Sequence, residues 1–192
     1  MSVSELNLTG FVLAGGKSSR FGSDKSLAPI NGKPMISYSL DLLKSCCQAV
    51  YVNRGKKEKE VYPDIDSICD LIPDIGPMGG IYSCLNASAT DYNLILTCDM
   101  PGLSSEMIKR IIDVWQRGRH EIIISKDREG NLYPFPGIYS KACIPVLRQL
   151  ILNHNYKIQN LIRQMQVGEY LLNEGDERYM VNYNYADPSV FG

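Results

Sequence analysis

The sequence predicts an α/β fold with three layers, in which helices cover both faces of a mostly parallel central sheet. Between residues 10 and 125, apolar runs of strand length alternate with segments of helical period, as in β-α-β units. The runs at 93–97 and 121–125 show little alternation of polar and apolar residues. Strands that are apolar on both sides are typical of parallel sheets buried between helices.

The expected elements follow one another as strand, helix and strand. Pro34 suits the first turn of a helix, and Ser104 is expected to cap a helix that carries Glu106 in its first turn. Strands are predicted at 10–14, 49–53, 67–72, 93–97 and 121–125, and helices at 35–46, 81–86 and 104–116.

The pattern changes after residue 125. A polar turn at 127–131 precedes a segment with two prolines at 133–139, a helical segment at 141–152 and a strand-like run at 179–184. We expect this smaller mixed region to pack on the same sheet. The chain is therefore predicted to form a single domain over 1–192, with one part at 1–125 and another at 126–192.

Composition and charge argue against several classes of function. Of the 192 residues, 44% are hydrophobic, which is enough for an ordinary buried core. Twenty Lys and Arg against 21 Asp and Glu give a net charge of -1, so no overall positive field favours nucleic acid or a membrane surface. No positively charged stretch precedes a long apolar segment at the start, and no run approaches the roughly 20 apolar residues that cross a bilayer, so we expect a soluble protein.

The six cysteines are not spaced like a zinc cluster or a C-x-x-C redox site. We expect them to be buried thiols in a protein of the reducing cytoplasm.

The segment LAGGKSSRFGSDK at 13–25 directly follows the first predicted strand, at the sheet edge where open α/β folds bind their ligands. Gly15 and Gly16 lack Cβ atoms, so their backbone N–H groups can approach phosphate oxygens. Two serines add hydroxyl donors, and Arg20 and Lys25 add positive charge. The segment is therefore expected to bind phosphate.

The spacing of this loop matches neither common phosphate motif. A Walker A loop requires glycine where Phe11 stands, and the G-x-G-x-x-G spacing is absent. A structural glycine turn with solvated charges stays open as the alternative.

Asp99, in TCDMPGL, comes directly after the buried strand at 93–97 and should reach the same edge. A carboxylate there can bind Mg²⁺ while phosphate oxygens and waters complete the octahedron. A cap or turn role is the alternative for Asp99 alone. The glycines of PDIGPMGG at 73–80 either permit close approach to a base or ribose, or form a structural turn.

Together, LAGGKSSRFGSDK, GPMGG, CDMP and the late VNYN resemble the MobA family, the molybdenum cofactor guanylyltransferases, among the nucleotidyltransferases with a Rossmann-like fold. The resemblance spans nearly the whole chain, and its most specific element is the signature LAGG-x-S-x-R-[FM]-G-x-D-K. Related sugar and terpenoid nucleotidyltransferases usually have alanine where Gly15 stands, so Gly15 favours the guanylyl branch.

The resemblance implies transfer of GMP from Mg·GTP to the terminal phosphate of molybdenum-bound molybdopterin, with release of pyrophosphate. It assigns nucleotide binding to residues 1–125 and the acceptor side to residues 126–192. The segment at 133–139 resembles the part that faces the second substrate, although its tyrosines and prolines could equally be packing residues. Proteins that supply the cofactor, or molybdoenzymes that receive it, are implied as transient partners.

The resemblance also implies roles for individual residues. The implied nucleotide-binding residues are Leu13, Ala14, Gly15, Gly16, Lys25, Asn53, Asp74 and Asp99. Lys25, Asp99 and Arg20 are the expected catalytic residues, Asp99 is the expected magnesium ligand, and Asn182 and Asn184 are expected beside the metal. Two departures from the family pattern bear on Asp74 and Asn184: a short spacing from Asp74 to Gly76, and NYADPS at 184–189 in place of N-T-P-E-D.

Such a reaction requires alignment and charge neutralisation more than covalent chemistry. No general base is needed because a phosphate acceptor is already ionised, which agrees with His120 and His154 lying outside every motif. Two alternatives stay open: a nucleotidyltransferase that uses CTP or a sugar phosphate, and a regulator that binds nucleotide without turnover.

Overall fold

The computed structural model describes residues 6–15, 25–56 and 65–180, with only the backbone described for Lys25. Its main strands are β1 (Leu8–Leu13), β4 (Ala49–Asn53), β5 (Ser67–Ile68), β6 (Tyr92–Thr97), β7 (Ile122–Lys126), β8 (Leu132–Ser140) and β9 (Val167–Leu171). Its α-helices are α1 (Met35–Lys44), α2 (Pro77–Ala87), α3 (Ser105–Arg117), α4 (Cys143–Leu152) and α5 (Ile158–Ile162). The short elements are η3 (Lys25–Leu27), β2 (Pro29–Ile30), β3 (Lys33–Pro34) and η4 (Asp176–Met180).

Seven strands form one sheet in the order β5-β4-β1-β6-β8-β7-β9. β8 runs antiparallel between β6 and β7, and every other pairing in this sheet is parallel. The prediction of a mostly parallel sheet is confirmed, and the region after residue 125 joins the same sheet.

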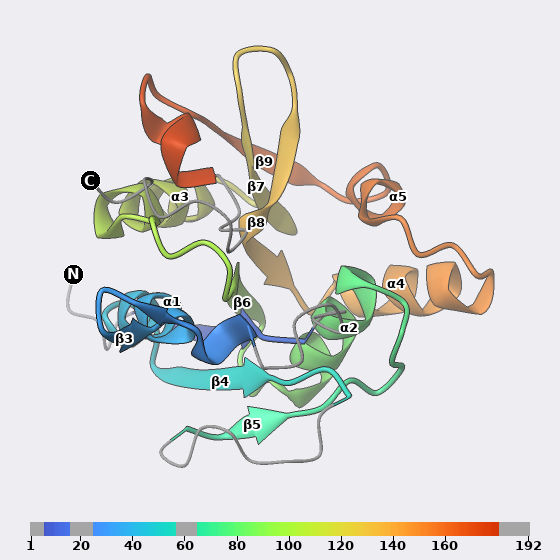
Figure 1. Cartoon of the computed structure of the whole chain (residues 1–192). Helices are drawn as coiled ribbons and strands as arrows, with labels where there is room; N and C mark the ends of the chain where they lie inside the picture. The colour runs from blue at the N-terminus through green and yellow to red at the C-terminus, as the bar shows by residue number, and fades with distance from the viewer. Residues whose placement is uncertain (1–5, 16–24, 57–64, 181–192) are drawn as a thin grey trace.

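Helices cover both faces of the sheet, as predicted: α1 and α3 lie on one side, and α2, α4 and α5 on the other (Figure 1). Successive side chains of a strand point to opposite faces. In β1, Val12 accordingly belongs to the buried cluster beneath α1 and α3, whereas Phe11 and Leu13 belong to the cluster beneath α2 and α4.

Local sequence explains several element boundaries. The Ser104 side chain accepts a hydrogen bond from the Met107 N–H at the start of α3, which confirms the predicted cap. Asn31 (φ 50°) and Gly32 (φ 77°) supply the left-handed conformations of a tight hairpin between β2 and β3. The strand predicted at 67–72 ends at Ile68, so that prediction was too long.

The region after residue 125 departs most from the prediction. The segment at 133–139 lies within β8, which crosses its two prolines. Of the strand predicted at 179–184, Tyr179 and Met180 belong to η4, so the prediction is wrong for them. The remaining residues of that run lie outside the described part of the chain.

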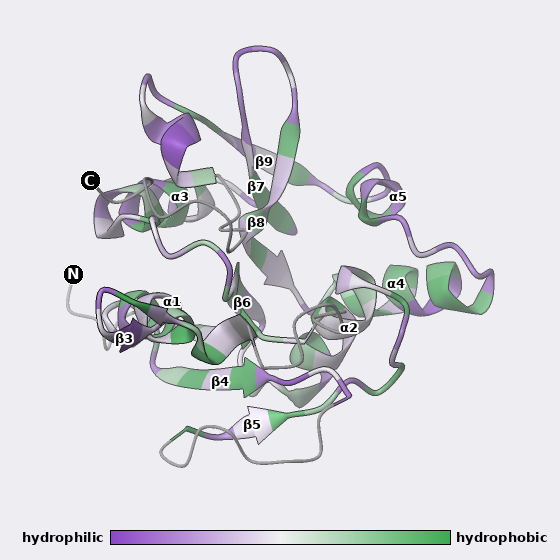
Figure 2. Cartoon of the chain, viewed as in Figure 1, coloured by the Kyte–Doolittle hydropathy of each residue, from purple (hydrophilic) through white to green (hydrophobic). Residues whose placement is uncertain are grey.

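The hydrophobic residues lie mainly in the sheet and the helices that cover it, for example in β4 and α4 (Figure 2). The loop between β7 and β8 is hydrophilic (Figure 2). None of the helices in the described ranges has the length and apolarity needed to cross a membrane. All six cysteines are free thiols. Four are buried as predicted, but Cys69 is exposed and Cys98 is half-buried.

Candidate active site at the switch point of the sheet

The carboxyl end of β1 lies where the order of the strands reverses. From β1 the chain passes through α1 to β4 on one side, and from β5 it passes through α2, on the opposite face, to β6 on the other side. Leu13 pairs with both Asn53 and Thr97. Open α/β sheets bind ligands at such a switch point.

Hydrogen bonds continue the pairing beyond the strand ends. The Ala14 N–H donates to the Asn53 carbonyl at 2.8 Å, and the Cys98 N–H donates to the Leu13 carbonyl at 3.1 Å. The structure therefore brings the start of the signature, Asn53 and the segment with Asp99 to one edge, as the sequence predicted.

Asp99 is half-buried, two residues beyond the end of β6. The Ser39 hydroxyl of α1 donates to the Thr97 carbonyl at 3.0 Å, which ties this strand end to the helix. Within the described ranges, the Asp99 carboxylate has no hydrogen-bond or ion-pair partner, and no group of three or more His, Cys, Asp or Glu forms a metal cluster. A single free carboxylate suits Mg²⁺, which keeps waters and phosphate oxygens as its other ligands.

Asn53 is buried, and its side-chain amide binds two parts of the protein. Its Oδ1 accepts from the Gly55 N–H at 2.8 Å, and its Nδ2 donates to Oδ1 of Asp70 at 2.9 Å. Asn53 thus lies at the predicted place, but its side chain connects the turn after β4 to the turn after β5.

Asp70 is the half-buried carboxylate that the sequence analysis missed. Burial raises the pKa of its carboxyl group, and the hydrogen bond from Asn53 offsets only part of that effect. In the described part of the chain, no donor reaches its Oδ2. Because the predicted strand ran to residue 72, Asp70 was assigned to its interior. The available signal was the charged residue itself, which interrupts the apolar run of that predicted strand.

Asp74, the predicted nucleotide-binding aspartate, forms its ion pair away from the Asn53 side chain. Its side chain is exposed, its φ is 66°, and its carboxylate forms an ion pair with Lys56. The structure brings Asp70 rather than Asp74 to Asn53.

Arg54 adds a cation that sequence reasoning did not single out. Its backbone lies against Gly15, and its Nη2 donates to the Cys69 sulfur at 3.6 Å. Its Nε and Nη1 are buried and have no hydrogen-bond partner among the described residues. Buried donors without acceptors are unfavourable, so this guanidinium is poorly satisfied by the described protein alone.

Two glycines of the 73–80 segment, Gly79 and Gly80, have packing roles. A Cβ on Gly79 would lie 2.6 Å from the Ile72 carbonyl oxygen, and one on Gly80 would lie 3.1 Å from the Leu13 side chain. Gly76 has a φ of 68° and open space around it.

In β8, Tyr139 is buried and donates to the Pro134 carbonyl at 2.8 Å, which makes it a packing residue.

Several predicted residues cannot be placed. Gly16, Arg20, Asn182 and Asn184 lie outside the described residues, and Lys25 is described only as the first backbone position of η3. Their assignments stay predictions.

The strand order and this polar, glycine-containing edge define the class of protein: an open α/β protein of the kind in which nucleotides bind at the switch point. The chain belongs to the family of the MobA-like NTP transferase domain, whose model matches residues 10–169. This confirms the family predicted from the signature and makes the protein a nucleotidyltransferase.

Three proteins illustrate the match. A Flavobacterium johnsoniae protein named "Probable molybdenum cofactor guanylyltransferase" is 32% identical over 180 residues, covering 94% of this chain and 93% of the relative. A solved structure from Aquifex aeolicus VF5 is similar with a TM-score of 0.78 at 26% identity, covering 94% of each chain. Molybdopterin-guanine dinucleotide biosynthesis protein A from Archaeoglobus fulgidus has a TM-score of 0.77 over 94% of each chain, and its 21% identity supports the fold alone.

Proposed function

We propose that this chain is a molybdenum cofactor guanylyltransferase, which transfers GMP from GTP to the terminal phosphate of molybdopterin. An acceptor phosphate oxygen forms a bond to the α-phosphorus of GTP, and the bond from that phosphorus to the bridging oxygen breaks as pyrophosphate leaves. The relative that is 32% identical over 94% of this chain supports the choice of substrates. The observation that carries the proposal is the meeting of Leu13, Asn53 and Thr97 in register at the switch point.

The nucleotide loop and Asp70 have separate tasks in this proposal. Backbone N–H groups from Gly15 onward and the Lys25 ammonium bind the triphosphate and neutralise its charge. Asp70 recognises guanine, since a carboxylate accepts hydrogen bonds from the N1–H and the 2-amino group, which adenine lacks. The unoccupied acceptor capacity of its Oδ2 within the described structure supports this role.

A magnesium ion fits the donor set at Asp99, because its half-buried carboxylate has no partner in the described ranges. When bound, the ion supplies positive charge at the α-phosphate and so stabilises the transition state. Asp99 holds that charge in place at the end of β6. We assign Asn182, Asn184 and Arg20 to the same reaction by their place in the family motifs.

The acceptor needs no general base, because its phosphate is ionised at neutral pH. We assign neither histidine as a general base. His154 contacts the Tyr156 hydroxyl, and the His120 ring packs against Gly118 and Gly168. Transient contact with cofactor-supplying proteins or molybdoenzymes, the absence of nucleic-acid and membrane partners, and a cytoplasmic location remain predictions.

The test measures melting temperature with GTP, ATP, CTP or UTP, each with and without Mg²⁺, and then pyrophosphate release with molybdopterin as acceptor. GTP with Mg²⁺ should stabilise the protein most, and release should require both GTP and acceptor. Equal stabilisation by all four nucleotides would refute guanine recognition. Stabilisation by GTP without turnover would instead indicate a regulator that only binds nucleotide.

A further inference from the structure

We propose that Gly55 is a positioning residue that determines nucleobase selectivity. Packed against Gly15, it fixes the distance between the Asn53–Asp70 pair and the strand end that binds the nucleotide. This inference rests on the proposed function, because it assigns base recognition to Asp70.

Both backbone groups of Gly55 bind the residues of this pair. Its N–H donates to the Asn53 side chain at 2.8 Å, and its carbonyl accepts from the Asp70 N–H at 2.9 Å. Its φ of 63° lies in the left-handed region, where glycine is strongly favoured. The turn after β4 thus holds Asp70 through two routes, one through the Asn53 side chain and one through its own backbone.

Gly15 and Gly55 also touch directly through their backbones. A Cβ on Gly15 would lie 2.6 Å from the Gly55 Cα and 2.7 Å from its nitrogen. A Cβ on Gly55 would lie 3.0 Å from the Gly15 Cα. Backbone atoms cannot rotate away as a flexible side chain can, so a methyl group on either residue must push the two turns apart.

Separation of these turns should alter recognition of the base more than binding of the phosphates. In the proposed function the phosphates bind to the segment that continues from Gly15, whereas Asp70 is held from the other side of the contact, by Gly55 and Asn53. Burial raises the pKa of the Asp70 carboxyl group, which agrees with a group that lacks donors until a ligand supplies them. A site that pairs with specific donors rejects analogues that lack them, provided its geometry is kept.

The test is Gly55→Ala, with dissociation constants measured for GTP, ITP, ATP and tripolyphosphate in the presence of Mg²⁺. ITP lacks the 2-amino group of GTP, so the ratio of the GTP and ITP constants isolates one hydrogen bond to the carboxylate. The variant should lose about tenfold of the selectivity for GTP over ITP, the worth of one charge-assisted hydrogen bond. Its affinity for tripolyphosphate should stay within about twofold of wild type, as expected for an independent contact.

Gly130→Ala is the matched control. Gly130 has a φ of 91°, so alanine there brings similar backbone strain, but no atom lies within 4 Å of the added methyl group. This variant should keep wild-type selectivity. Gly15→Ala adds its methyl group to the same contact without a left-handed φ, and it should lower GTP over ITP selectivity even if Gly55→Ala does not fold.

Failure of the proposed function and failure of the inference about Gly55 give different results. A wild-type protein without preference for GTP over ATP would overturn the proposed function. A GTP-selective wild type whose Gly55→Ala variant, or Gly15→Ala variant if that alone folds, is equally selective would overturn this inference alone. Equal weakening of every ligand, tripolyphosphate included, would also overturn it, because Gly55 would then act on the whole site and not on the base.

Discussion

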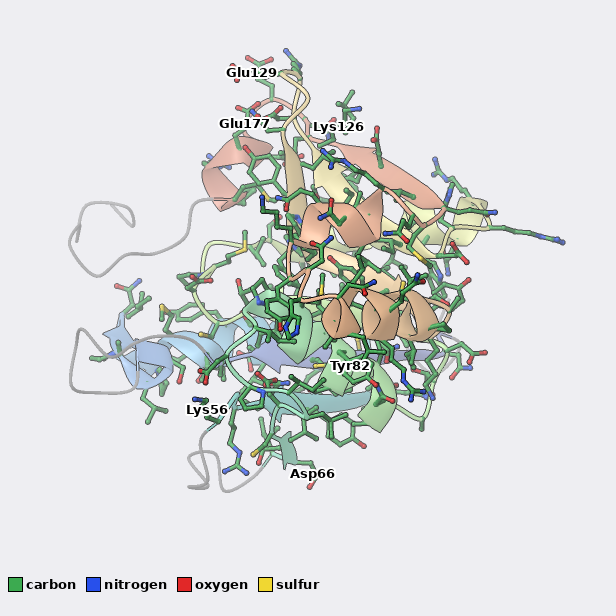
Figure 3. All side chains as sticks on the ribbon, turned by 90° about the vertical axis from the view of Figure 1, so that its right-hand side faces the viewer. Lys56, Asp66, Tyr82, Lys126, Glu129 and Glu177 are labelled. Carbon is green, nitrogen blue, oxygen red and sulfur yellow. The ribbon has the colours of Figure 1, made fainter. Side chains whose placement is uncertain are left out.

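Asp70 and Asp127 both lie just beyond strands at the carboxyl edge of the sheet, in opposite halves of the molecule, and their surroundings differ sharply. Asp70 follows β5 and receives one hydrogen bond, from Asn53. Asp127 follows β7 and is buried in the hairpin before β8. It accepts four hydrogen bonds, from the Glu129 N–H, the Asn131 N–H, the Asn131 side chain and the Tyr133 hydroxyl. Figure 3 shows that these two regions are far apart. Lys126 and Glu129 lie on either side of Asp127 in sequence, and Lys56 lies in the turn after β4.

The pKa values of the two carboxyl groups shift in opposite directions. Hydrogen bonds, the largest from the Asn131 side chain, lower the pKa of Asp127, whereas burial raises that of Asp70. A carboxylate satisfied by its own loop stabilises that loop. A carboxylate that is buried without enough hydrogen-bond donors lowers the stability of the protein. A ligand that supplies those donors restores the lost stability. These opposite shifts support a structural role for Asp127 and the proposed ligand-binding role for Asp70.

The largest effect should come from Asp99, whose carboxylate at this edge has no hydrogen-bond donor among the described residues. Asp99→Asn keeps the size of the side chain but removes the charge that holds a metal ion, so the transfer rate should fall on the order of 10²–10³-fold. GTP affinity should fall at most about tenfold, because the loop still binds the phosphates. Pyrophosphate release over a magnesium titration measures the rate, and calorimetric titration with GTP measures the affinity.

Asp91 provides the control for that prediction, since it is an exposed aspartate just before the same strand. Asp91→Asn should behave like wild type. Wild-type turnover by Asp99→Asn at limiting Mg²⁺ would show that Asp99 takes no part in the reaction and is a structural residue.

Asp70→Asn should weaken GTP binding by about 10–100-fold, because an amide cannot accept both hydrogen bonds that guanine donates and the lost bonds are charge-assisted. The melting temperature without ligand should stay equal or rise, since a poorly satisfied buried charge disappears. Calorimetric titration and thermal unfolding test the two parts. A destabilised variant with normal GTP affinity would show that Asp70 is structural.

Asp127→Asn should do the opposite. The variant should melt at a lower temperature because it cannot accept all four hydrogen bonds of the loop, while GTP affinity should stay within about twofold of wild type at this separate site. The same two measurements apply. A loss of GTP affinity without loss of stability would contradict the assignment.

The smallest effect concerns the pH dependence of stability. A raised pKa in the folded state means that Asp70 contributes stability below its unfolded pKa, near 3.9, which is lost as pH rises through its folded pKa. The lowered pKa of Asp127 contributes stability above that value, which is lost as pH falls through its folded pKa.

Thermal unfolding of both Asn variants against wild type from neutral to acidic pH tests these signs. The advantage of Asp70→Asn over wild type should shrink as the solution is acidified. The deficit of Asp127→Asn should shrink only at still lower pH. Parallel curves for both variants would show that neither carboxyl group titrates with folding.

Much of the fold followed from local sequence. Buried strands such as β6 carry apolar runs, and α3 carries its own cap, so periodicity and capping were sufficient for them. β5 pairs over two residues only, which no pattern within 67–72 could reveal. β8 was missed because its prolines argue against a strand, and its place beside β6 depends on pairing with residues far away in sequence.

Site residues could be predicted where a candidate residue lies close behind a strand that is itself recognisable. Asp99 and the glycine pair could be predicted as candidates because each follows an apolar strand. Asp70 was not found, and Asp74 was chosen in its place, because their difference lies in contacts with Asn53 and Lys56 from another turn. The necessity of glycine at position 55 comes from the approach of Gly15, which appears only when two strands pair.

The place of β8 in the sheet has a consequence for synthesis on the ribosome. β6 completes the first part of the sheet, and in the described structure residues 132–140 pair with its other edge. At about 5–20 residues per second, translation of residues 98–140 takes roughly 2–9 s. For that interval the nascent chain carries an apolar strand with unpaired backbone groups, which neighbouring nascent chains can bind. A chaperone that shields this edge would therefore raise the yield of folded protein.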